Sequence, residues 1–313
     1  MSIANLDRAY CHETDSILTI YQVRELHFDE TVNFQADKAT YECPDRNCNV
    51  EITGVNHTKT KFKVSPHFRL LPKHEHNEDC SFYSVKKPAG KSDHKGKQKS
   101  SKPVIKHPEV LLLDKQPIPH NTGKTEILDI SGFEGKKDTK NKSRLASSDK
   151  QKYTTSSLEH VVETWLTHSE EELKYSLLTI GDTTKWYRNI FKEIKYFTDG
   201  EGLIYWGYLK EIKAYGKGYA FKFIDKPWFK GEERYISIYV SAKQIDKYRK
   251  KTLFRSYIDS LIDRDDIKVR CFFVGAYPKL TKIKHKGRDF FPLKVEINNL
   301  DHLLLRFDED ENI

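Results

Sequence analysis

Residues 41–83 read YECPDRNCNVEITGVNHTKTKFKVSPHFRLLPKHEHNEDCSFY, and they hold three of the five cysteines of the 313-residue chain. Four residues separate Cys43 from Cys48, and three separate His76 from Cys80. Structural zinc is bound by four Cys or His side chains supplied as two such short pairs, because both members of a pair reach one ion from a single turn. We therefore predict a structural Zn²⁺ site made of Cys43, Cys48, His76 and Cys80.

Other uses of these residues are less well supported. His67 and His74 are competing imidazoles, but the spacing of His76 suits a tight turn before the last cysteine. A disulfide is disfavoured because no signal peptide precedes the cluster. A catalytic zinc needs an open fourth position beside an acid, and although Glu75 and Glu78 flank His76, four good ligands leave no vacancy. Ordinary reduced cysteines in a cytosolic protein remain the alternative.

The order of these residues carries a resemblance to a known family. A Cys-Pro pair, Cys43-Pro44, is followed by Cys48, by the dipeptide His67-Phe68, and then by the final His and Cys. This pattern, across residues 36–80, resembles the zinc-binding N-terminal region of competence protein CoiA-like bacterial proteins. The loop before the second cysteine is longer here than in that family. The resemblance implies a zinc-binding β module and, as in many relatives, a nuclease domain downstream.

Charge is distributed unevenly along the chain, whose net charge is +8. Residues 1–85 hold 9 basic and 13 acidic side chains, and residues 153–199 hold 5 and 8. Residues 86–152 hold 17 basic and 8 acidic side chains, and residues 200–313 hold 23 and 17. Groups able to neutralise phosphates therefore lie in these last two regions. No apolar run approaches the roughly 20 residues of a membrane helix, so we expect a cytoplasmic protein without a membrane partner.

The first half of the chain is predicted to contain a small module and a linker. Residues 1–85 are expected to form the CoiA-like zinc-binding β module, a small antiparallel sheet with strands within residues 16–34 and at residues 61–64. Residues 86–152 are rich in Lys, Gly, Ser and Pro, which predicts a basic flexible linker. One apolar run inside it, residues 110–113, is a candidate for a short docked strand.

Residues 153–199 are predicted to be a helical segment. Ser156 or Ser157 can cap a first helix whose apolar positions from Leu158 onward recur at helical spacing. Asp182 or Thr183 can cap a second helix, with apolar residues again on one face. The shared apolar face is typical of helices that pack in a core.

Residues 200–313 change to the alternating pattern of strands. Gly216 and Gly218 in the turn 215–218 favour a hairpin. Three strands, then a helix at 243–263, then two strands are expected, and this is the element order of an OB-fold barrel. The predicted fold is thus α+β and multidomain: a zinc-stapled antiparallel β module, a basic linker, a helical segment and an OB-like β-barrel.

An OB-like barrel suggests a nucleic-acid site. OB-folds bind single strands on their second and third strands and adjoining loops, where bases stack on aromatic rings and basic side chains meet phosphates. The alternative is that the aromatic residues of the predicted second strand, Phe221 and Phe223, fill the interior of the barrel and do not contact nucleic acid. The candidate residues for binding single-stranded DNA or RNA are Tyr219, Trp228, Tyr235, Tyr239, Lys268 and Arg270.

Two other functions compete with nucleic-acid binding. The resemblance implies a Mg²⁺-dependent nuclease, and Asp199, Glu211 and Lys213 mimic its Asp…Glu-x-Lys set. No turn separates Asp199 from strand 203–213, however, so the two acids cannot lie side by side on a metal. A protein-interaction adaptor is the third candidate. We expect a non-enzymatic, zinc-containing nucleic-acid-binding protein of a bacterium or mobile element, acting in DNA processing or phage defence.

Overall fold

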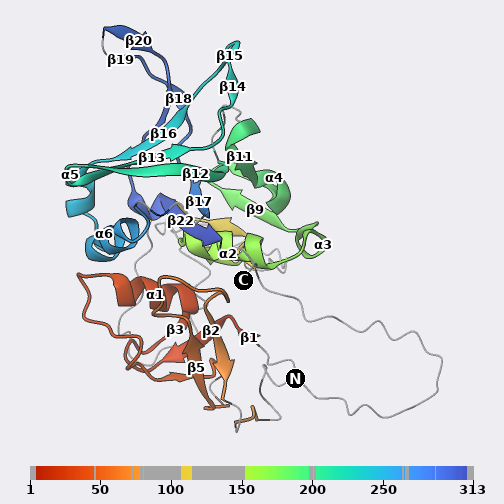
Figure 1. Cartoon of the computed structure of the whole chain (residues 1–313). Helices are drawn as coiled ribbons and strands as arrows, with labels where there is room; N and C mark the ends of the chain where they lie inside the picture. Colours follow the sequence, from red (N-terminus) through yellow and green to blue (C-terminus); the bar gives the residue numbers. More distant parts are fainter. Residues whose placement is uncertain are drawn as a thin grey trace, which may run out of the picture. The chain divides into compact units, whose positions relative to one another are not determined.

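A computed structural model of the chain shows an α+β protein with two compact units (Figure 1). The first unit takes most residues up to His107, and the second takes most residues from Pro108 onward. None of the described helices is both long and apolar enough to cross a membrane. The predicted linker falls outside the described residues except for 107–114 and 152. The structure describes residues 5–45, 47–71, 74–77, 80, 107–114, 152–196, 200, 202–262, 264, 268–285 and 287–308.

In its described residues, the first unit has a six-stranded antiparallel sheet and one helix, in agreement with the predicted small antiparallel sheet. Helix α1 (Ile20–Phe28) buries Val23 and Leu26 in one cluster with Leu18 and Phe68 of the sheet. In spatial order the strands are β1 (Asn5–Leu6), β6 (His67–Leu70), β5 (Glu51–Val55), β4 (Tyr41–Glu42), β2 (Arg8–Cys11) and β3 (Ser16–Thr19).

Helix α1 replaces part of the strand region predicted for residues 16–34, so that part of the prediction is wrong. The backbone N–H of Gln22 donates to Oγ1 of Thr19 at 3.2 Å, and the N–H of Thr19 donates to Oε1 of Gln22 at 2.8 Å. This reciprocal pair is a capping box, which satisfies two backbone donors at the start of a helix. The helix therefore begins as soon as β3 ends.

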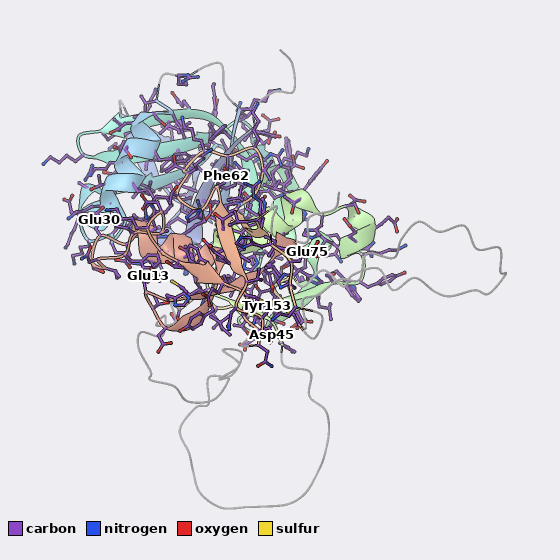
Figure 2. The ribbon with its side chains drawn as sticks, turned by 90° about the horizontal axis from the view of Figure 1, so that it is seen from below. Glu13, Glu30, Asp45, Phe62, Glu75 and Tyr153 are labelled. Atoms are coloured by element: carbon purple, nitrogen blue, oxygen red, sulfur yellow. The ribbon has the colours of Figure 1, made fainter. Side chains whose placement is uncertain are left out.

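The prediction of a strand at residues 61–64 is also wrong, because Phe62 lies in a loop. Its ring, labelled in Figure 2, lies 5.2 Å from the guanidinium carbon of Arg24. One terminal nitrogen of Arg24 is within 2.8–3.1 Å of the carbonyl oxygens of Asn56, His57 and Lys59. A buried arginine thus organises the loop that leads into β6.

The second unit is built on a large sheet. Two short helices, α5 (Ala242–Asp246) and α6 (Lys251–Asp259), lie between the strands Ile236–Val240 and Lys268–Phe273, where the sequence predicts a single helix at 243–263. The order of the strands is β18 (Lys279–Leu280), β21 (Leu293–Val295), β16 (Ile236–Val240), β13 (Gly218–Phe223), β12 (Ile204–Tyr215), β17 (Lys268–Phe273) and β22 (Leu303–Asp308), with β11 (Phe191–Glu193) parallel to β12.

The predicted barrel is not found as a closed ring. Strand β21 runs parallel to β16, while the other strands named above pair antiparallel along the path. Over the residues described, no pairing joins the β18–β21 edge to β17 or β22. The sheet is therefore open at both ends of its strand order.

The segment before this sheet is partly helical. Helix α2 (Leu158–Thr167) begins where predicted, and Oγ of its cap Ser157 accepts the N–H of His160 at 3.3 Å. The docked strand predicted at 110–113 is present as β7 (Val110–Leu111), which pairs with β8 (Thr154–Thr155) and β9 (Leu177–Ile180). A short helix, α3 (Glu170–Leu173), follows α2.

The prediction of a second helix starting at residue 182 is wrong, because a strand begins at Thr183. Gly181, with φ +56°, makes the turn between β9 and β10 (Thr183–Trp186), which pair from Ile180 and Thr183 outward. Only one helical turn, α4 (Tyr187–Ile190), separates β10 from β11, and the 3₁₀ turn η1 (Ile194–Tyr196) follows. The β-branched residues and the glycine turn therefore favour a hairpin over the helix.

Helix α2 and the large sheet share one hydrophobic core. The indole of Trp165 stacks on the ring of Phe191, with centroids 4.5 Å apart and planes 10° apart. Trp206 and Phe272 lie beside it, at 5.5 and 6.0 Å. Residues 153–196 thus pack as part of the body formed by the C-terminal strands.

Candidate metal centre and sheet surface

The loop between β4 and β5 positions the first two candidate ligands. The N–H of Cys43 donates to the carbonyl of Val50 at 2.9 Å, which extends the β4–β5 pairing by one step. The N–H of Cys48 donates to the carbonyl of Asp45 at 2.9 Å and closes a turn. The sequence between the cysteines therefore folds back on itself and brings both thiols to the base of one loop.

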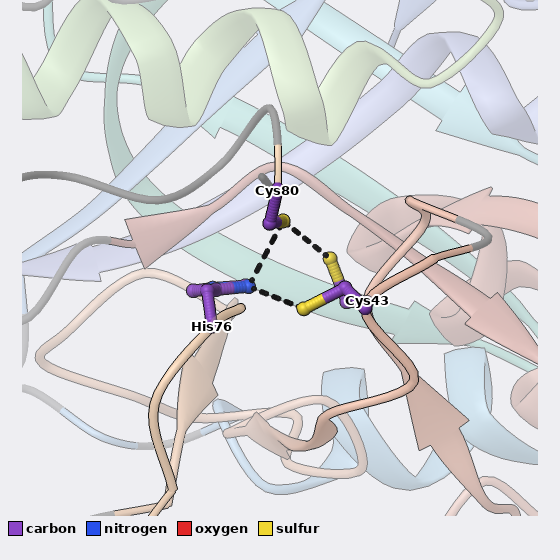
Figure 3. A group of neighbouring side chains, drawn as sticks. Cys43, His76 and Cys80 are labelled. Atoms are coloured by element: carbon purple, nitrogen blue, oxygen red, sulfur yellow. Dashed lines mark hydrogen bonds between the residues drawn. The ribbon is translucent and has the colours of Figure 1, made fainter. Parts of the chain in front are cut away.

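All four predicted ligands come together. Sγ of Cys43 lies 3.6 Å from Sγ of Cys80, and Nδ1 of His76 lies 3.2 Å from Sγ of Cys48 and 3.4 Å from Sγ of Cys80. The four ligand atoms lie within 4.8 Å of one another, and Figure 3 shows the side chains of Cys43, His76 and Cys80 converging. The group is close enough to hold a metal ion.

A second layer of contacts fixes this group. The N–H of Asp45 donates to Sγ of Cys43 at 3.5 Å. The side-chain amide of Asn77 donates to the carbonyl of Asn47 at 2.8 Å and to that of Cys48 at 3.4 Å. Asn77 therefore ties the segment that carries the second pair of ligands to the loop that carries the first. Sequence reasoning missed it, although its position directly after His76 was a signal.

Burial favours the neutral forms of two of the candidate ligands, Cys43 and His76. The three cysteines are only 4–6% exposed. Burial raises the pKa of the Cys43 thiol, and burial lowers the pKa of the His76 imidazole. A divalent cation reverses the preference of the thiols, because metal binding requires thiolates and releases their protons.

The competing imidazoles lie outside the group. His67 is the first residue of strand β6, and its Nδ1 lies 2.9 Å from the carbonyl oxygen of Ser65. His74 is not among the residues whose ligand atoms converge. His76 is therefore the imidazole that the fold presents to the three thiols.

Of the four aromatic residues predicted to bind nucleic acid, three are exposed to solvent and one is buried. Tyr235 and Tyr239 are 60% and 50% exposed, and Trp228 is 70% exposed. Tyr219 is 4% exposed, and its hydroxyl donates to Oδ1 of Asp259 at 2.7 Å. The prediction that Tyr219 stacks on a base is wrong, because its ring lies in the core.

The predicted basic pair lies on another part of the sheet. Lys268 and Arg270 belong to β17, which β12 and β13 separate from the strand of Tyr239. Nε of Arg270 donates to the hydroxyl of Tyr208 at 3.1 Å, and its guanidinium carbon is 5.9 Å from the Trp206 ring. The predicted nucleic-acid residues therefore do not form one continuous surface.

A row of lysines that sequence reasoning missed lies beside Tyr239. Lys222 is directly opposite Ser237, Ser237 is opposite Lys294, and Lys294 is opposite Lys279. Directly opposed residues share a face of a sheet, so these side chains lie on the outward face, between Tyr235 and Tyr239. The signal in the sequence was the alternation of Lys222 with buried Phe221 and Phe223. We call Lys222, Lys294 and Lys279 the lysine row.

Glu211, one of the candidate nuclease residues, is paired with two lysines. Oε1 of Glu211 accepts from Lys222 at 2.5 Å, and its Oε2 lies 3.0 Å from Nζ of Lys213. Hydrogen bonds from Lys222 and then Lys213 hold the pKa of Glu211 below its ordinary value. Asp199 lies outside the described residues.

Comparison with known proteins adds no family to this picture. No protein-family model matches the sequence, and no curated protein is detectably similar to it. The resemblance to CoiA-like proteins therefore stays a prediction that depends on the residues quoted for it.

Proposed function

We propose that the first unit holds one structural Zn²⁺ ion through Cys43, Cys48, His76 and Cys80. Zn–S bonds of about 2.3 Å and Zn–N bonds of about 2.0–2.1 Å place tetrahedral ligand atoms roughly 3.5–3.8 Å apart. Three of the separations, at 3.2–3.6 Å, are close to that value, and all four ligand atoms lie within 4.8 Å of one another. Soft thiolates suit zinc over magnesium or calcium. Four ligands fill the coordination shell, so the ion would stabilise the fold and not carry out chemistry.

Metal analysis tests this site. Purified protein is expected to contain about one equivalent of zinc, and a chelator is expected to unfold the first unit because binding energy is folding energy at such sites. Circular dichroism before and after chelation is the second measurement. Less than half an equivalent, together with unchanged folding after chelation, would contradict the proposal.

We propose, for the whole protein, non-enzymatic binding of single-stranded DNA or RNA by the outward face of β13, β16 and β21. The observation that carries this proposal is the placement of exposed Tyr235 and Tyr239 on either side of the lysine row. Bases stack on aromatic rings and lysines neutralise phosphates, so this pattern supports binding without base specificity. The proposed setting in DNA processing or phage defence depends on the CoiA-like resemblance alone.

The spacing of the two tyrosines supports the same reading. Four residues along a strand span about 13 Å, and between the rings lies the small side chain of Ser237. Nζ of Lys226 lies 4.5 Å from the centroid of the Tyr235 ring. The Tyr235 ring thus has a cation beside it that could meet the phosphate of a stacked nucleotide.

Substitution of both tyrosines tests the nucleic-acid site. Stacking is worth roughly 1–3 kcal/mol per base, so Tyr235→Ala with Tyr239→Ala should weaken binding to an oligothymidylate at least about tenfold. The matched control is Tyr175→Ala, which removes a ring that is 76% exposed on another part of the unit. Equal affinity of the double variant and the wild type, with normal folding, would favour the adaptor function. Mg²⁺-dependent cleavage of the oligonucleotide would favour the nuclease.

A further inference from the structure

Two β-hairpins extend from the large sheet. The first pairs β14 (Trp228–Phe229) with β15 (Glu232–Glu233), and the second pairs β19 (Ile283–His285) with β20 (Arg288–Phe290). Both project beyond the body of the sheet in Figure 1. We call residues 226–234 and 279–291 the two arms.

The arms leave the sheet at the same end because they precede parallel strands. The first arm leads into β16 and the second into β21, and these strands run parallel with Ile236 opposite Leu293. The N–H of Leu293 donates to the carbonyl of Tyr235 at 2.8 Å. Nη1 of Arg234 donates to the carbonyl of Phe291 at 3.2 Å. The bases of the arms are therefore tied side by side.

The turn of the first arm has a defined type. Lys230 and Gly231 have φ angles of +51° and +81°, the two positive values that a two-residue type I′ hairpin needs. Gly287, in the turn of the second arm, has a φ of +80°. The first arm is thus a twisted hairpin of fixed register, and the second arm pairs Ile283 with Phe290.

Both arms expose apolar rings. Trp228 is 70% exposed, Phe290 is 46% exposed and Phe291 is 39% exposed. Lysines accompany the rings: Nζ of Lys282 is 6.0 Å from the Phe291 centroid, and Nζ of Lys230 is 5.6 Å from that of Phe229. Large exposed rings in a cluster mark an interaction surface.

The arms also hold most of the excess positive charge of residues 200–313. Together they contain eight basic and three acidic side chains, an excess of +5, where residues 200–313 as a whole have an excess of +6. Two of the three acids are paired: Glu232 lies 2.8 Å from Arg234, and Asp289 lies 2.8 Å from Lys282. The third, Glu233, is opposite Trp228. This charge suits a polyanion.

We infer that the two arms extend the proposed sheet site and bind the same single strand of nucleic acid where it continues beyond the sheet. In this arrangement Trp228 and Phe290 stack on bases. The inference depends on the proposed function. It is supported by continuity, because Tyr235 directly follows the first arm and Lys279 belongs both to the second arm and to the lysine row. An anionic membrane surface is the competing occupant. It would need only the arm tips, whereas rings and cations continue from the arms across the sheet.

Oligothymidylates of about 4 to about 16 nucleotides, the range of site sizes known for single OB-folds, test this inference. Wild-type affinity should rise with length. The pair Trp228→Ala and Phe290→Ala should lower affinity for the longest oligonucleotide about tenfold or more and leave the shortest nearly unaffected. The pair Trp228→Phe and Phe290→Tyr keeps both rings and should restore most of the affinity. Thermal unfolding of each variant checks the fold.

A second readout follows Trp228 itself. The chain has four tryptophans, and stacking on a base should quench the fluorescence of the exposed one on titration. Trp228→Phe should remove that quenching while binding, measured by anisotropy of a labelled oligonucleotide, persists. Quenching that survives in Trp228→Phe would overturn the placement of Trp228 on a base.

The outcomes separate this inference from the proposed function. Wild-type binding that the alanine pair leaves unchanged at every length overturns the arms but not the sheet site. No wild-type binding to any oligonucleotide overturns the proposed function and the inference with it. Binding to phosphatidylserine vesicles that is lost in the alanine pair, without oligonucleotide binding, assigns the arms to a membrane instead.

Discussion

At the scale of the residue, only one of two neighbouring histidines joins the three cysteines of the candidate metal centre. His74 and His76 differ by two positions, but only Nδ1 of His76 lies within 3.2–3.4 Å of two thiol sulfurs. The turn in which the N–H of Cys80 donates to the carbonyl of Asn77 at 2.9 Å sets this choice. An imidazole two residues earlier starts from a different part of the chain and does not join the group.

Replacement of each histidine by alanine should therefore give opposite results. His76→Ala is expected to reduce bound zinc below half an equivalent and to destabilise the first unit, because one ligand of four is lost. His74→Ala is the matched control and should keep about one equivalent. Zinc content by mass spectrometry under native conditions measures both. Full zinc in His76→Ala and loss in His74→Ala would reverse the assignment.

Local spacing explains which residues could be predicted. The four candidate ligands come from two short stretches of sequence, so their spacing was sufficient to predict that they come together. The tyrosines were different: alternation places Tyr219 with Phe221 and Phe223 on one face, but it does not say which face is buried. That answer depends on what packs against the sheet, and here it places Tyr219 against Asp259.

At the scale of the element, helix α2 is attached to the sheet through one large side chain. Trp165 stacks on Phe191 of β11 and contacts the rings of Trp206 and Phe272 on two further strands. Nε of Arg306 on β22 also donates to the buried carboxylate of Glu163 on α2 at 2.7 Å. The helix is thus part of the second unit's folding core.

Truncation of Trp165 should destabilise the second unit. Trp165→Ala is expected to lower the free energy of unfolding by about 3 kcal/mol, the low end for a core tryptophan, because the ring is partly buried. Trp228→Ala, at an exposed ring, should change it by less than about 0.5 kcal/mol. Urea unfolding measures both. A loss below about 1 kcal/mol in Trp165→Ala would mean that α2 is a peripheral addition.

Elements were predictable where one local signal acted alone. Ser157 and the apolar spacing after it identified α2, and the glycine turn at 215–218 identified the β12–β13 hairpin. The errors came from competing signals. The spacing of Trp186, Ile190 and Ile194 also suits a helix, but Gly181 forms a turn and β10 pairs with β9. At α1, the capping pair of Thr19 and Gln22 outweighed a β-rich composition.

At the scale of the whole molecule, the proposed surface depends on a pairing between distant strands. Lys222 and Lys294 come together only because β21 pairs in parallel with β16 and β13 pairs with β16 on its other side. No pattern within either strand specifies that neighbour. The sequence could therefore place positive charge in the C-terminal region, but it could not place that charge on the face of Tyr235 and Tyr239.

The lysine row should consequently control the salt dependence of binding. For single strands, the slope of log K against log salt concentration is about −0.7 per neutralised phosphate. Exchange of Lys222, Lys294 and Lys279 for glutamine should make the slope shallower by about 1.4 to 2 units. The lower value applies if the ion pair of Lys222 with Glu211 keeps this lysine from neutralising a phosphate. Glu211 keeps Lys213 as a partner after the exchange, so no buried charge is left alone.

The matched control exchanges three exposed lysines on other elements, Lys174, Lys185 and Lys251, for glutamine. It removes the same net charge from the protein, so a general effect of charge would change both triple variants equally. Anisotropy titrations of a labelled oligothymidylate at several salt concentrations give the slopes. The row variant alone should show the shallower slope, because only those lysines lie between two exposed rings on one sheet face. Equal slopes for both variants would mean that the strand follows the protein's overall charge and has no path across the sheet.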